Sequence, residues 1–279
     1  MNEGGQAALP QAFFLPAAKG QRFCLFHAPQ GDAQKGLVLY LHPFAEEMNA
    51  SRRVVAQQCR ELATTGYAVL QIDLLGCGES SGDFADATWS DWIADALLGL
   101  DWLCQYNAKV PVWLWGLRSG TLLACATAGA CLAKAGAPTP NLLLWQPLAS
   151  GQQQLQQFLR LHSAAQWLGR GAAGEPPAQA LAHGRHAHVA GYRMSPALAT
   201  ELSAARLDLP AAHGHVQIID LLAPDPQTVS PWILRQQSQW QIDGWQVQVR
   251  AVPAPPFWQN VVDNSLSDGL AQATREALS

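Results

Sequence analysis

The stretch 112–124 limits the possible folds more than any other part of this sequence. A strand-length apolar run is followed by a tight turn that contains glycines and then by an apolar helix start. Gly116 and Gly120 lie two residues before and two residues after Arg118, so Arg118 is expected at the tip of the turn. A strand that passes directly into a helix is the repeating unit of folds with a parallel sheet. The stretch therefore predicts an α/β fold in which the end of one strand presents position 118.

The same alternation of strand and helix runs through most of the chain. Continuous apolar runs, typical of strands buried on both faces, occupy 36–42, 67–73 and 141–145. A hairpin over 12–15 and 22–27 is expected at one edge of the sheet. The other expected elements are helices 51–65, 91–106 and 120–136, strand 216–222, helix 230–239, strand 245–252 and a terminal helix after residue 263. This order predicts a mostly parallel central sheet with helices on both faces.

Residues 151–210 interrupt the alternation and are expected to form a helical lid insertion over the C-terminal ends of the strands. The core domain would then comprise 1–150 and 211–279. Within the insertion, the Gln-rich run 152–157 is interpreted as a solvated face of a helix. A second helix is expected over 196–206.

Composition excludes several classes of function. The chain has 279 residues, a net charge of −4 and only 14% charged residues, without a basic stripe, so nucleic acid is not expected as a partner. No run approaches the roughly 18 apolar residues that span a membrane, and no signal peptide is recognised, so a cytoplasmic protein is expected. The six cysteines are scattered singly, and the histidines of 183–188 have no Cys or acidic residue at ligand spacing. Reduced thiols are therefore expected, and neither a metal nor a cofactor is predicted.

Several motifs resemble the α/β-hydrolase superfamily and, within it, the exosortase A system-associated hydrolase 2 family. This resemblance implies the α/β-hydrolase fold. It also implies a bacterial protein encoded alongside exopolysaccharide biosynthesis and the exosortase sorting of PEP-CTERM proteins, with proteins of that pathway as its partners. It does not imply a substrate. The motifs that carry the resemblance lie at 41–49, 72–84, 115–118, 144–147 and 256–258.

In α/β hydrolases the tip of the turn in Gly-x-Ser-x-Gly carries the catalytic nucleophile. The positions two before and two after the tip must be small, and this requirement selects Arg118 rather than Ser119 as the tip residue. A guanidinium only donates hydrogen bonds and is not a nucleophile. The backbone N–H of Ser119 is expected to line the oxyanion hole.

The histidine that would act as base is also missing. In the superfamily it follows the last strand, and this sequence has no histidine beyond His215. His215 precedes strand 216–222, whose length places it roughly 20 Å from the active-site end. Asp225 follows the same strand and resembles the family's catalytic acid. Catalysis by a Ser–His–Asp triad is therefore not expected.

Three readings of the site stay open. Arg118 could form an internal ion pair with Glu46, Glu47 or Asp225. It could instead anchor a carboxylate or phosphate ligand in a catalytically inactive binding or scaffold protein. Or a rearranged site could hydrolyse an ester, thioester or amide, with Ser119, His42 or Cys77 as candidate groups, so a small acyl ligand also fits. The other residues expected around the pocket are Phe44, Ala45, Glu46, Glu47 and His42.

Overall fold

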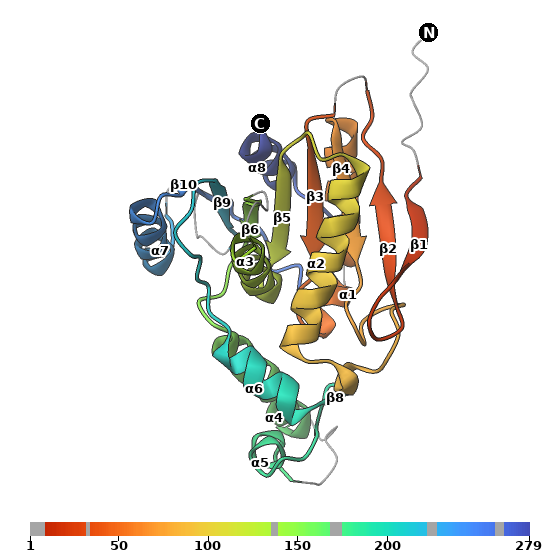
Figure 1. Ribbon diagram of the computed structural model, residues 1–279. Coiled ribbons are helices and arrows are strands. Elements are labelled where there is room, and N and C mark those ends of the chain that lie inside the picture. Colours follow the sequence, from red (N-terminus) through yellow and green to blue (C-terminus); the bar gives the residue numbers. More distant parts are fainter. Residues whose placement is uncertain (1–8, 32–33, 135–138, 168–174, 222–227, 260–264) are drawn as a thin grey trace.

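The computed structural model describes residues 9–31, 34–134, 139–167, 175–221, 228–259 and 265–279 (Figure 1). Its centre is an eight-stranded sheet with the order β1-β2-β4-β3-β5-β6-β9-β10. β1 and β2 form an antiparallel hairpin, β2 pairs antiparallel with β4, and the remaining neighbours are parallel. The strands are β1 (Gln11–Pro16), β2 (Gln21–His27), β3 (Gly36–Leu41), β4 (Tyr67–Ile72), β5 (Val112–Leu117), β6 (Asn141–Trp145), β9 (His215–Asp220) and β10 (Gln246–Ala251).

Helices cover both faces of this sheet, as Figure 1 shows. α1 (Glu46–Thr64) and α8 (Asp268–Leu278) pack on one face, where Val54 and Leu270 belong to the same buried cluster. α2 (Trp89–Tyr106), α3 (Ser119–Leu132) and α7 (Pro231–Ile242) pack on the other face. Every residue of β3 and β5 is buried, which explains why both strands are continuously apolar. The prediction of a mostly parallel central sheet with helices on both faces is confirmed.

Helix α1 begins five residues earlier than predicted. The helix was expected from residue 51, but α1 starts at Glu46. Ala45 precedes it with φ 51° and ψ −125°, so the chain turns sharply after β3 and enters the helix at once. Glu46 and Glu47 lie in the first turn, where the helix dipole favours negative charge. Both carboxylates are thus helical residues with restricted positions.

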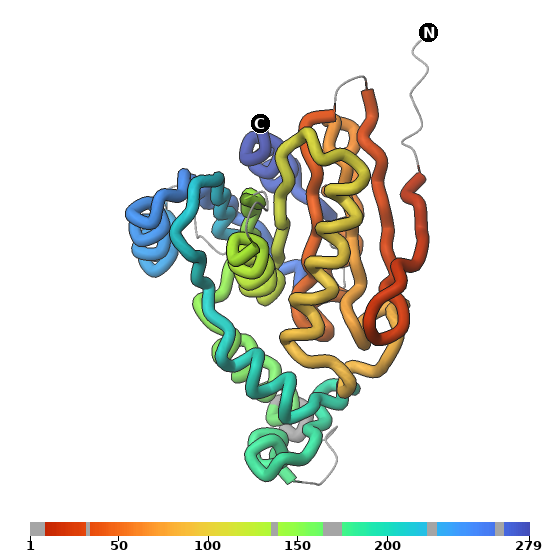
Figure 2. The backbone as a smooth tube through the Cα atoms, in the orientation of Figure 1, coloured from red at the N-terminus to blue at the C-terminus, as the bar shows by residue number. Residues whose placement is uncertain are grey.

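The segment between β6 and β9 lies below the C-terminal edge of the sheet in Figure 1. The tube in Figure 2 leaves the sheet after β6, runs through this segment and returns to β9. It contains α4 (Gly151–Trp167), α5 (Pro177–Ala182), β7 (Ala187–Val189), β8 (Tyr192–Met194) and α6 (Pro196–Ala204), while a short 3-10 helix, η1 (Phe84–Asp86), precedes α2. The segment therefore lies at the edge of the sheet where β5 turns into α3.

The hairpin of β7 and β8 was not predicted. His188, from the histidine-containing stretch 183–188, lies in β7. Its turn contains Ala190 (φ 50°) and Gly191 (φ 86°), and two consecutive residues with positive φ match a tight hairpin turn. Because such turns usually carry Asn-Gly or Asp-Gly, the pair Ala-Gly gave a weak signal in the sequence.

Candidate functional site

The turn between β5 and α3 has the geometry of a hydrolase elbow with arginine at its tip. Arg118 has φ 55° and ψ −119°, a conformation rare for a residue with a side chain. A Cβ atom at Gly116 would lie 2.5 Å from the carbonyl carbon of Gly120, and one at Gly120 would overlap the carbonyl oxygen of Leu41. Glycine at both positions is therefore required by the close approach of the backbones.

The backbone is similarly strained after β3 and β6, the two strands that lie beside β5. Ala45 after β3, Arg118 after β5 and Gln146 after β6 all have φ between 44° and 55°. Each such conformation costs about 1–3 kcal/mol and persists only where the surrounding structure enforces it. These three residues mark one edge of the sheet as the candidate site.

The guanidinium of Arg118 is almost completely enclosed, with 7% of the side chain exposed. Its Nη2 lies 3.3 Å from Oε1 of Glu47 on α1 and donates to Oε1 of Gln157 on α4 at 2.7 Å. Its Cζ lies 5.4 Å from the ring centroid of Trp258, which follows β10. The last contact is a cation–π interaction. Arg118 thus joins three elements that are far apart in the sequence.

Not every polar atom around Arg118 is satisfied. Nε of Arg118, Oε2 of Glu47 and Oε1 of Gln154 are buried and have no hydrogen-bond partner among the described residues. Burial raises the pKa of Glu47, and the charge of Arg118 and a hydrogen bond from Gln154 oppose this shift. A buried donor or acceptor that is left unpaired costs about 1–3 kcal/mol. The pair therefore retains unused hydrogen-bonding capacity.

Ser119 and His42 lie near each other but do not form a hydrogen bond within the described part of the chain. Both line a small apolar cavity of about 10 Å³, together with Phe44 and Trp92. Nδ1 of His42 lies 2.8 Å from the carbonyl oxygen of Pro43, and Nε2 accepts from the backbone N–H of Leu74 at 3.4 Å. These partners assign a neutral ring with its proton on Nδ1, and burial lowers the pKa of His42. Backbone groups thus occupy both ring nitrogens.

The remaining predicted residues have different surroundings. Asp225 lies outside the described residues. Burial raises the pKa of the Cys77 thiol, which keeps it protonated. His183 pairs with Glu175 at 2.9 Å. No cluster that could hold a metal ion occurs in the described ranges.

His215 begins β9, at the strand end opposite the elbow, as predicted. At the other end of β9, Asp220 accepts hydrogen bonds from the backbone and side chain of Ser230. Asp220 was not singled out from the sequence.

Sequence reasoning also missed the contribution of α4. The run 152–157 was interpreted as a solvated helix face, and this is wrong for Gln154, which is 2% exposed, and for Gln157, which bonds Arg118. Gln154, Gln157 and Phe158 follow the i, i+3, i+4 spacing of one helical face, which could have revealed them. Trp258 had no such signal, because its role depends on how the chain returns after β10.

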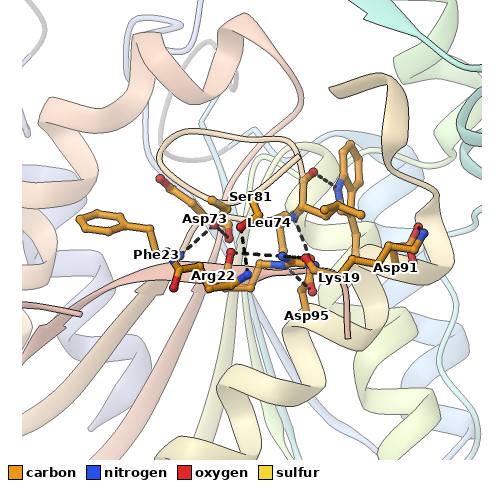
Figure 3. A network of polar contacts seen from close by, with 12 residues as sticks. Lys19, Arg22, Phe23, Asp73, Leu74, Ser81, Asp91 and Asp95 are labelled. Atoms are coloured by element: carbon orange, nitrogen blue, oxygen red, sulfur yellow. Dashed lines mark hydrogen bonds and ion pairs between the residues drawn. The ribbon is translucent and has the colours of Figure 1, made fainter. Parts of the chain in front are cut away.

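The loop after β4 is held by hydrogen bonds to β2 and α2. The Ser80 hydroxyl donates to the carbonyl oxygen of Asp73 at 2.6 Å and accepts from the backbone N–H of Phe23 at 2.9 Å. Beside it, Arg22 and Asp95 form a buried ion pair at 2.7 Å, shown in Figure 3. These contacts attach the loop to β2 and α2, so they support the site without entering it.

Comparison with known proteins identifies the relatives of this fold. The sequence model of the family described as serine aminopeptidase, S33, matches residues 32–183, which is more than half of the chain. The lysophosphatidylserine lipase ABHD12 of Xenopus tropicalis is 30% identical over 118 residues, which is 42% of this chain and 29% of that protein. An uncharacterised protein of Rickettsia prowazekii, RP471, is 38% identical over 80 residues, which is 29% of this chain and 32% of that protein. The aligned part therefore spans about a third or less of each relative's length.

Solved structures share the fold at low sequence identity. A putative hydrolase from Agrobacterium vitis superposes with a TM-score of 0.61 at 17% identity and covers 98% of this chain and 100% of its own. XC6422 from Xanthomonas campestris, described as an α/β serine hydrolase without lid, gives a TM-score of 0.55 at 16% identity and covers 97% of this chain and 94% of its own.

None of the described helices is both long and apolar enough to cross a membrane.

Proposed function

The chain belongs to the serine aminopeptidase S33 family of α/β hydrolases, and on that premise we propose that it binds an anionic ligand at Arg118 and does not hydrolyse through a Ser–His–Asp triad. The anion would be a carboxylate or a phosphate. Arg118 occupies the tip at which this fold otherwise presents a nucleophile. The ring of Trp258 lies over the guanidinium of Arg118. Trp258 belongs to the segment after the last strand, where the catalytic base is otherwise expected.

The observation that carries this proposal is the unpaired Nε of the Arg118 guanidinium. Nη2 donates to Gln157 and to Glu47, but the neighbouring Nε has no partner among the described residues. Nε and Nη2 lie on the same edge of the planar group, and a carboxylate can bond both at once. A single amide oxygen bonds only one of them. An anion that replaces the Gln157 side chain would therefore bond more N–H groups of the guanidinium than that side chain does.

When an anion binds, Glu47 should take up a proton. Glu47 lies 3.3 Å from Nη2, and burial already raises its pKa. A second negative charge beside Glu47 favours its protonated form further. We expect the affinity to increase as the pH falls towards the pKa of the ligand, and calorimetry in buffers of different ionisation enthalpy should detect the proton uptake. An affinity that does not change with pH would show that Glu47 remains ionised in the complex.

Calorimetric titration with acetate and with inorganic phosphate tests the proposal. Arg118→Ala should abolish binding, and Arg118→Lys should weaken it because lysine keeps the charge but loses the two-pronged geometry. Arg206→Ala, which removes an exposed arginine that bonds its own backbone neighbours, serves as control. Equal affinity in the wild type and Arg118→Ala would reject the proposal.

Hydrolysis of an ester, thioester or amide through a rearranged site is the second candidate. The observation in its favour is that Ser119 and His42 line the same small cavity. A panel of acyl esters, thioesters and amides should show no turnover if the binding function is right. Turnover that disappears in both Ser119→Ala and His42→Ala would establish hydrolysis instead.

The physiological setting that we propose comes from the resemblance to exosortase A system-associated hydrolases. The anionic ligand would then arise in exopolysaccharide synthesis or in the sorting of PEP-CTERM proteins. Deletion of the gene should impair one of these processes, and complementation with the Arg118→Ala variant should fail. Normal polysaccharide and sorting in the deletion strain would exclude this setting.

A further inference from the structure

Five aromatic side chains form a cluster next to the elbow, which we call the aromatic cluster: Phe44, Phe84, Trp92, Phe158 and Tyr192. Phe44 meets three of the other rings, those of Phe84, Trp92 and Phe158, at steep angles. Its centroid lies 5.1 Å from Phe158 at 81° and 5.2 Å from Phe84 at 77°. Only Phe158 comes from α4, so one member of the cluster can leave without disturbing the sheet.

Two consecutive residues of α4 fill two different places at the site. Gln157 presents an oxygen to Nη2 of Arg118 at 2.7 Å, and Phe158 presents a ring to the edge or face of Phe44. The cavity between Phe44 and Ser119 has a volume of only about 10 Å³, which is about the volume that one water molecule needs. A ligand larger than water therefore does not fit this cavity, and room for a ring beside Phe44 would have to come from displacement of Phe158, which is buried against it.

Resting on the proposed binding of an anion at Arg118, we propose that the ligand class is an arylalkyl carboxylate, whose carboxylate replaces the Gln157 side chain and whose ring replaces Phe158. One ligand that carries both an acid group and an aromatic ring could replace the oxygen and the ring that α4 places there. The carboxylate gains the bond to Nε that Gln157 does not make. The ring enters a slot bounded by Phe44 and Tyr192, whose centroids lie 5.1 and 6.3 Å from that of Phe158.

An aryl group is favoured over an alkyl chain by the geometry of this slot. Edge-to-face contacts between rings add stabilisation beyond the area that they bury. That increment corresponds to an affinity about 2- to 12-fold higher for an aromatic ring than for a saturated ring of similar size. Charge and ring therefore contribute separately and can be measured separately.

The test is calorimetric titration of the full chain with three matched probes: 3-phenylpropionate, 3-cyclohexylpropionate and 3-phenylpropanamide. We expect 3-phenylpropionate to bind most tightly, the saturated acid more weakly by the factor given above, and the uncharged amide most weakly. Phe44→Leu should remove the preference for the aromatic ring while retaining binding of the acid. Phe158→Ala should tighten binding of 3-phenylpropionate, because it removes the side chain that competes for the slot.

Gln156→Ala is the control for Phe158→Ala, since Gln156 lies on the same turn of α4 but is exposed. It should leave all three affinities unchanged. If Phe158→Ala does not fold, the comparison of the two acids on the wild type still decides the question.

Equal affinity for the two acids, with binding still dependent on Arg118, would overturn the aryl assignment and leave the anion site intact. Absence of any binding that depends on Arg118 would overturn both.

Discussion

At the scale of single residues, replacement of the nucleophile by arginine changes the chemistry of the elbow without changing its shape. Arg118 keeps the strained backbone of a catalytic tip although a guanidinium cannot attack a carbonyl. The strain is retained because Gly116 and Gly120 bring the two backbones together regardless of the side chain at the tip. The side chain then determines whether the site reacts or binds.

The buried ion pair of Arg22 and Asp95 gives a first test of stability. The side chains are 2% and 5% exposed, and Asp95 also accepts from the backbone N–H of Leu75. Arg22→Met should lower the free energy of unfolding by about 3–5 kcal/mol, because it leaves a buried carboxylate without its partner. Urea denaturation measures this change.

The neighbouring pair of Lys19 and Asp91, also visible in Figure 3, provides the control. It has a similar distance of 2.8 Å, but the lysine side chain is 54% exposed. Lys19→Met should cost only about 0.2–1 kcal/mol. Similar losses in the two variants would show that burial does not determine the strength of these pairs.

At the scale of elements, the sequence predicted the sheet well and the edge that carries the site less well. Buried strands such as β5 and β6 are continuous apolar runs, and the structure places β6 at 141–145 as predicted. The start of α1 was missed because it depends on the positive φ of Ala45, which alanine does not signal. The buried face of α4 was missed because glutamine is read as a solvent-exposed residue.

The site was therefore predictable only in part. The glycine spacing identified Arg118 as the tip, because steric crowding is local and follows from the sequence. The contacts of Arg118 with Gln157 and Trp258 come from elements that follow it by 39 and 140 residues. Such contacts depend on how distant segments pack, which neither spacing nor composition reveals.

The strand–helix turn itself can be tested with two glycines of α3. Gly120→Ala should destabilise the protein by about 1–3 kcal/mol or more, because the new Cβ would overlap the backbone of Leu41. Gly129→Ala should be neutral or stabilise by up to about 1 kcal/mol, since its nearest contact would be Pro210 at 3.8 Å and alanine favours a helix. Thermal denaturation of the two variants should separate them. Equal melting temperatures would show that the close backbone approach at Gly120 does not exist.

At the scale of the whole molecule, the segment between β6 and β9 and the sheet edge close one site together. α4 contributes Gln157 and Phe158, the sheet edge contributes Arg118 and Phe44, and the chain after β10 contributes Trp258. The site is complete only when these parts have come together. Binding of a ligand should therefore be coupled to the position of α4.

The stability of the whole molecule should also depend on pH through His27. Burial, and then the charge of Arg60, lower its pKa to about 4, from about 6.5 in the unfolded chain. Between these values the unfolded state binds more protons, so stability is full above pH 6.5 and is lost as the pH falls towards 4. The loss due to His27 should reach about 3 kcal/mol.

Urea denaturation between pH 4 and pH 7 measures this dependence. His27→Gln, which does not titrate in this range, should lose correspondingly less stability than the wild type. Identical pH profiles for the two proteins would place the sensitive group elsewhere.

The position of a bound anion tests the central claim most directly. A crystal structure of the protein with 3-phenylpropionate should show the carboxylate oxygens about 3 Å from Nε and Nη2 of Arg118, with the side chain of Gln157 displaced. A ligand bound elsewhere, with the contact between Arg118 and Gln157 intact, would contradict the claim that Arg118 converts this elbow into an anion site.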